Sequence, residues 1–178
     1  MARSIRVLAI AAGVLLGASG ANALSFTITA LLDGLQEVPV VVTPGTGSLT
    51  GTYDSDSNLL TWSGSFADLT GTTTDAHFHG PAAVGVSAGV QVHMTAGGGG
   101  DTFPLGVTSG AFSGSATITE TQEGQLLAGL WYTNIHSTFR PGGEIRGQVL
   151  AVLVPEPGAA LLLGLGLAGL GWAGRRLR

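Results

Sequence analysis

Four histidines supply the clearest chemistry in this sequence, because imidazole titrates near neutral pH and is the commonest transition-metal ligand in proteins. They are His77, His79, His93 and His136. His77 and His79 are two residues apart in a segment with strand-like alternation, so both side chains point to one face, together with Asp75. His93 and His136 fall on the polar faces of two other alternating segments. If these segments are neighbouring strands, three or four imidazoles converge outside the apolar core.

Two interpretations of the histidines follow. Neutral imidazole binds copper or zinc well, and a His-x-His pair on a strand offers two ligands on one face. Alternatively, the histidines are solvated or hydrogen-bonded and hold no ligand. The sequence leaves both open, and the geometry decides between them: a metal site needs imidazole nitrogens that can reach one point at about 2.0–2.1 Å.

The composition excludes several other kinds of site. The chain has no Cys, which excludes disulfides, thiolate zinc sites and a Cys nucleophile. Its 178 residues carry a net charge of −4 with no Lys, a poor balance for binding nucleic acid. We find no nucleophile elbow or recognisable catalytic triad, and predict that the protein is not an enzyme. The carboxylates are expected to be solvated or to cap turns and helices; those considered are Glu37, Glu120, Glu123 and Glu144.

The elements that must position the histidines are predicted to be β-strands. Apolar and polar residues alternate with period two in segments near 25–30, 48–53, 60–66, 75–79, 90–94, 112–119, 131–136 and 145–153. Short Thr-rich strands with Gly turns indicate an all-β antiparallel sandwich or flattened barrel. One polar segment, residues 119–127, is predicted to form a short helix, because Thr119 and Gln122 have the spacing of a capping box.

Glu144 and Arg146 are two residues apart and share a strand face after the turn at 140–143. Residues 24–154 contain only two cations, Arg140 and Arg146, and have a net charge of −8. Arg146 is therefore expected to bridge carboxylates or carbonyls on the sheet.

The N-terminus has the pattern of a secretory signal peptide. Arg3 and Arg6 precede an apolar run, and residues 21–23 read Ala-Asn-Ala, the small-x-small form of a cleavage site. We predict that residues 1–23 are removed after export by the Sec machinery.

The C-terminus has a second, distinct pattern. Pro155, Glu156 and Pro157 are followed by an uncharged apolar stretch over 159–174 and an Arg-rich end. The stretch is predicted to form a transmembrane helix, and the arginines of the C-terminal end that follows it are predicted to stay on the cytoplasmic side. In this order, the three parts resemble a PEP-CTERM sorting signal. The resemblance implies recognition by an exosortase, transient anchoring in the inner membrane, removal of the tail, and release to the outer surface or extracellular matrix.

The middle of the chain resembles the CHRD domain. The residues that carry the resemblance are Leu35-Gln36-Glu37-Val38-Pro39, His77-Phe78-His79-Gly80-Pro81, the segment 129–137 and Pro141-Gly142-Gly143-Glu144-Ile145-Arg146. The resemblance implies an immunoglobulin-like or superoxide-dismutase-like β-sandwich and no settled activity.

These observations predict three parts: a signal peptide over 1–23, a CHRD domain over 24–153 and a sorting signal over 154–178. The predicted function is that of an exported protein with a structural or binding role, whose partners are polysaccharide or surface proteins. The alternative is a copper- or zinc-binding envelope protein that uses His77, His79, His93 and His136.

Overall fold

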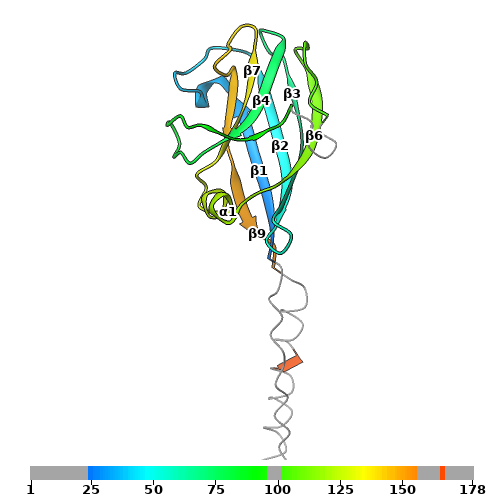
Figure 1. Ribbon diagram of the computed structural model, residues 1–178. Helices are drawn as coiled ribbons and strands as arrows, with labels where there is room; N and C mark the ends of the chain where they lie inside the picture. Colours follow the sequence, from blue (N-terminus) through cyan, green and yellow to red (C-terminus); the bar gives the residue numbers. More distant parts are fainter. Residues whose placement is uncertain (1–23, 96–101, 156–164, 167–178) are drawn as a thin grey trace, which may run out of the picture.

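A computed structural model describes residues 24–95, 102–155 and 165–166 (Figure 1). The described part contains nine strands, a short 3-10 helix and one α-helix. The elements are β1 (Ser25–Asp33), η1 (Gly34–Gln36), β2 (Thr46–Asp54), β3 (Leu59–Ala67), β4 (Thr73–His79), β5 (Val90–His93), β6 (Gly110–Thr117), α1 (Glu120–Leu127), β7 (Tyr132–Ser137), β8 (Ile145–Gln148) and β9 (Leu150–Leu153).

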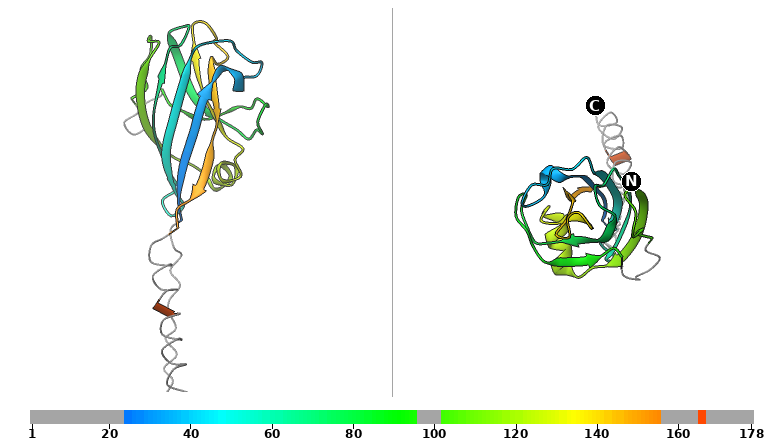
Figure 2. Two further views of the ribbon diagram at one scale, coloured as in Figure 1. Left: turned by 180° about the vertical axis from the view of Figure 1, so that it is seen from behind. Right: turned by 90° about the horizontal axis from the view of Figure 1, so that it is seen from above.

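The strands form one hydrogen-bonded sheet in the order β5-β4-β7-β8-β1-β2-β3-β6, with β9 also paired to β1. Every pairing is antiparallel. Seen from above, the sheet curls around a central core and nearly closes (Figure 2). The predicted antiparallel all-β architecture is therefore confirmed, in the form of a single curved sheet with one helix.

The last predicted strand, over 145–153, is divided in two by the structure. β8 lies between β7 and β1 and pairs with both, whereas β9 pairs with β1. Between them, the buried Val149 donates its backbone N–H to the carbonyl of Trp131 at 2.9 Å. The chain thus stays beside β1 but leaves its pairing with β7 near Val149, which alternation alone could not show.

The apolar residues of the alternating strands meet inside the curled sheet. The largest members of this core include Tyr53, Trp62, Phe78 and Trp131. Trp62 meets Phe78 edge-on, with ring centroids 5.2 Å apart. Because Phe78 points inward, its neighbours His77 and His79 must lie on the other face of β4.

The helix α1 begins and ends as the sequence predicts. The Thr119 side chain accepts a hydrogen bond from the Gln122 backbone, and the Gln122 side chain accepts one from the Thr119 backbone. The helix stops before Gly129, which has a φ of +70°. Leu126 is fully buried and anchors the helix to the core.

The two ends of the described domain are neighbours. Phe26 of β1 is opposite Leu153 of β9, and Val154 N–H donates to the Ser25 carbonyl at 2.8 Å. The predicted signal peptide, over 1–23, lies outside the described residues, as does nearly all of the predicted transmembrane segment at 159–174. Within the described part, no helix is long and apolar enough to cross a membrane.

Candidate metal centre

The strand β4 brings the histidines together because it pairs with β5 on one side and β7 on the other. His77 is directly opposite His93 of β5. On the β7 side, Asp75 is opposite His136 and His77 is opposite Asn134. Side chains from three strands therefore gather on the face of the sheet that does not contact the core.

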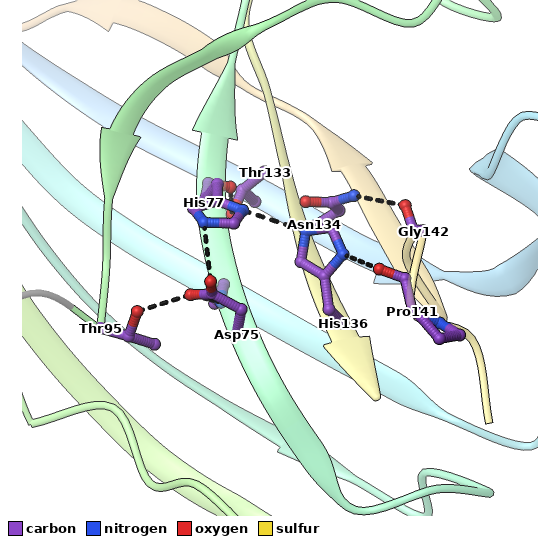
Figure 3. Close-up of polar contacts among 9 residues, drawn as sticks. Asp75, His77, Thr95, Thr133, Asn134, His136, Pro141 and Gly142 are labelled. Atoms are coloured by element: carbon purple, nitrogen blue, oxygen red, sulfur yellow. Dashed lines mark hydrogen bonds and ion pairs between the residues drawn. The ribbon is translucent and has the colours of Figure 1, made fainter. Parts of the chain in front are cut away.

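One ligand atom from each of His77, His79 and His136 lies within 4.8 Å of the other two. We call these three residues the histidine cluster. The closest pair is His77 Nδ1 and His136 Nε2, which are 3.0 Å apart (Figure 3). The fourth predicted ligand, His93, falls into a second group with Asp75 and His77, under the same distance limit. The structure thus brings all four predicted histidines into two groups that share His77.

Backbone carbonyls orient two rings of the histidine cluster. His79 donates from Nδ1 to the Ala88 carbonyl at 3.0 Å, and His136 donates from Nδ1 to the Pro141 carbonyl at 2.8 Å. Since a carbonyl can only accept, both Nδ1 atoms carry the proton and each neutral ring has its lone pair on Nε2. This is the arrangement by which proteins orient metal-binding histidines.

The histidine cluster is covered rather than exposed. His77 and His79 are each 8% exposed, His136 is partly buried and His93 is exposed. As predicted, none belongs to the apolar core. The loop at 80–89 contacts the histidine cluster at His79, through the Ala88 carbonyl. The loop is held by the Tyr132 hydroxyl, which accepts from the Ala88 N–H at 3.2 Å.

Burial keeps the covered rings neutral. It lowers the pKa of His77 to about 4, against the opposing attraction of Asp75. Burial also lowers the pKa of His79 below its ordinary value, although the hydrogen bond to Ala88 acts against it. Among the described residues, His79 Nε2 is a buried nitrogen without a hydrogen-bond partner. A buried lone pair with no donor is costly, and a metal ion would satisfy it.

Asp75 is fixed so that one of its oxygens faces the histidine cluster. Its Oδ1 accepts hydrogen bonds from the Thr95 hydroxyl and the Ala76 N–H. Its Oδ2 lies 3.1 Å from His77 Nε2 (Figure 3). Burial alone would raise the pKa of Asp75, but these hydrogen bonds and the neighbouring His77 outweigh it and hold the pKa below its usual value.

Arg146 donates to a carbonyl, as predicted, but that carbonyl lies in the 80–89 loop and not on the sheet. Its guanidinium donates to the Val86 carbonyl at 2.8 Å and lies over the Tyr132 ring, 3.4 Å from the centroid. It therefore fixes both the 80–89 loop and the aromatic ring beside His79.

The expectation that Glu144 is solvated or capping is wrong, as is the expectation that Glu37 is solvated, although Glu37 does occupy the C-cap of η1. Glu144 is fully buried, and its carboxylate accepts from the Thr43 hydroxyl, the Thr70 and Gly71 N–H groups and the Ser137 hydroxyl. Glu37 is 7% exposed, and burial raises its pKa. Both carboxylates are hydrogen-bonded elsewhere, so neither joins the histidine cluster.

Sequence reasoning missed the groups that hold the rings. The Ala88 and Pro141 carbonyls come from loops. Because every residue has a backbone carbonyl, residue type does not indicate which of them accepts a hydrogen bond from a histidine. Asp75 was placed on the correct face by its spacing, although not as a ligand. The aromatic support of His79 by Tyr132 had no sequence signal beyond the alternation of β7.

Comparison with protein families identifies the chain. The CHRD domain model matches residues 28–149, well over half of the sequence. The chain belongs to the CHRD family. The model of the PEP-CTERM protein-sorting motif matches residues 153–176 of this CHRD protein. Comparison with curated proteins and with solved structures gave no match.

The sorting motif makes this CHRD protein an exported, membrane-transiting substrate of an exosortase. Pro155 is exposed at the end of the described domain, while Glu156 and Pro157 lie outside the described residues. The signal peptide and the domain limits at 24, 153 and 154 stay predictions.

Proposed function

We propose that this exported CHRD protein binds copper or zinc through His77, His79 and His136. The observation that carries the proposal is His79, whose Nδ1 is held by a carbonyl while its buried Nε2 has no hydrogen-bond partner among the described residues. His79 belongs to a group of three histidines, each of which offers one ligand atom within 4.8 Å of the other two.

The chemistry of the donor set favours these two metals. Three neutral imidazoles suit zinc and copper, whereas calcium and magnesium require oxygen ligands. Three protein ligands leave a coordination position for water or another ligand, as in zinc sites that remain open. The proposed function is binding without turnover. A structural or adhesive role in the matrix, with polysaccharide or surface-protein partners, stays a prediction from the sequence.

Equilibrium dialysis tests the proposal. The full chain, purified in detergent, is dialysed against Cu(II) and separately against Zn(II). We expect the wild type to bind the metal. We expect the affinity of His79→Ala and of His136→Ala to be lower than that of the wild type by roughly tenfold or more, since loss of a ligand should cost at least as much as loss of a residue that only orients a ligand. Asp56→Ala is the control, because Asp56 is an exposed turn residue outside both groups of metal-binding side chains.

The result that would overturn the proposal is equal binding by the wild type and a folded variant in which His77, His79 and His136 are all replaced by Ala. Circular dichroism of each variant establishes that it is folded.

A further inference from the structure

His77 belongs to two groups of metal-binding side chains at once. The first is the histidine cluster of His77, His79 and His136, and the second contains Asp75, His77 and His93. An imidazole has two nitrogens and can serve two groups only if each nitrogen faces one of them.

The two nitrogens of His77 face different partners. Nδ1 lies 3.0 Å from His136 Nε2, and Nε2 lies 3.1 Å from Asp75 Oδ2 (Figure 3). Two ligands at tetrahedral positions around one zinc or copper ion, each about 2.0–2.1 Å from it, are separated by about 3.3 Å. Both spacings are therefore close to those of ligands that share an ion.

No neutral form of His77 satisfies both partners. With the proton on Nδ1, the ring donates to His136, but the Nε2 lone pair then faces the Asp75 carboxylate. With the proton on Nε2, two lone pairs face each other at 3.0 Å. Although it is near Asp75, the buried Nε2 has no aligned hydrogen-bond partner in the described part of the chain. A cation on each side would remove both conflicts.

The remaining ligands of the second group are already in place. His93 is opposite His77 in the β4–β5 pairing, with ring centroids 4.7 Å apart. Asp75 is oriented by Thr95 and by the Ala76 N–H, which bind its other oxygen. Since His93 is exposed, this group opens to solvent and offers an entry path for the ion.

We propose that His77 bridges two metal ions as an imidazolate, with His79 and His136 completing the first site and Asp75 and His93 completing the second. The proposal rests on the proposed metal-binding function. On binding, the His77 ring loses its remaining proton to solvent, and each nitrogen donates one lone pair to one ion. The metal class is copper or zinc in both sites.

Copper alone tests the bridge, because it reports both stoichiometry and coupling. The full chain in detergent is dialysed against Cu(II), and bound copper is counted by elemental analysis. We expect two ions per chain. Electrons on two Cu(II) ions joined by an imidazolate couple antiferromagnetically, so the paramagnetic resonance signal should be well below the copper content.

Variants of the second site separate the two proposals. His93→Ala and Asp75→Asn should retain one ion per chain and restore the full resonance signal per copper. Asp56→Asn, a change at an exposed turn residue, is the matched control and should bind two ions. One ion per wild-type chain, or two ions with full signal intensity, would overturn the bridge and leave the metal-binding function intact. No bound ion would overturn both.

Discussion

The imidazole of His79 lies parallel to the phenol ring of Tyr132, with centroids 4.9 Å apart and an interplanar angle of 4°. The two side chains also share an acceptor. The Ala88 carbonyl accepts from His79 Nδ1 at 3.0 Å and from the Tyr132 hydroxyl at 3.3 Å. Tyr132 therefore restricts both the plane of the His79 ring and the position of its hydrogen-bond partner.

Substitution of Tyr132 should weaken metal binding without removing a ligand. In Tyr132→Phe the stacked ring remains and only the hydroxyl contacts to Ala88 are lost, so we expect a change of a few fold. In Tyr132→Leu the plane against His79 is lost, and affinity should fall by roughly 10–100-fold, the usual effect of outer-shell changes. Copper competition with a chelator measures both. Wild-type affinity in a folded Tyr132→Leu protein would show that the stacking does not position His79.

The metal-free protein should lose stability as the pH falls from 7.5 to 5.5. Burial lowers the pKa of His77 to about 4; Asp75 opposes the shift, and His136, His79 and His93 add to it. An unfolded histidine has a pKa of about 6.5, so between these values the unfolded chain binds more protons than the folded one. The contribution is fully present above the unfolded pKa and is lost as the pH falls toward 4.

Urea unfolding at the two pH values, with chelator present, measures this effect. In His77→Gln the loss of stability between pH 7.5 and 5.5 should be smaller than in the wild type. An equal loss in both proteins would contradict the assignment of this pH dependence to His77.

Glu144→Gln should destabilise the fold by roughly 2–3 kcal/mol, because hydrogen bonds to a buried charged group are strong and an unpaired donor is costly. An amide NH₂ group would face the N–H groups of Thr70 or Gly71, which now donate to the carboxylate. The matched control is Glu120→Gln, an exposed residue in the first turn of α1, which should change stability by only a few tenths of a kcal/mol. Urea unfolding of both variants measures the difference, and equal stabilities would show that Glu144 is not structurally required.

Replacing Pro155, Glu156 and Pro157 by Ala should stop removal of the tail, because these residues form the sorting motif recognised by the exosortase. The membrane fraction should then contain the chain with its C-terminus intact, as intact-protein mass spectrometry would show. Replacing the exposed Leu150 and Val152, which precede the matched residues 153–176, by Ala in a separate variant controls for changes in local sequence. Normal processing of the motif variant would contradict the prediction.

The strands and the helix of this protein could be predicted from the sequence, whereas the pairing of strands in the sheet could not. Alternation placed His77 and His79 on one face, since that follows from strand geometry within seven residues. It could not place His136, which reaches His77 only through the β4–β7 pairing across 59 positions. Nor could it show that His79 is covered, because the 80–89 loop contacts His79 through a backbone carbonyl, that of Ala88. The burial of Glu144 was missed for the same reason: its donors come from three separate segments, near 43, 70 and 137.

The pairing of β1 with β9 places the end of the described domain directly before the sorting motif. The Val154 N–H is bonded to the Ser25 carbonyl, so the last hydrogen bond of the sheet lies immediately before the sorting motif. Leu153 and Val154 are half-exposed and belong to no part of the core. All nine strands and every core residue of the described part lie before Glu156, so a cut beyond this point removes none of them. The described domain can therefore complete its folding before the tail is removed, and removal of the tail does not require the domain to refold.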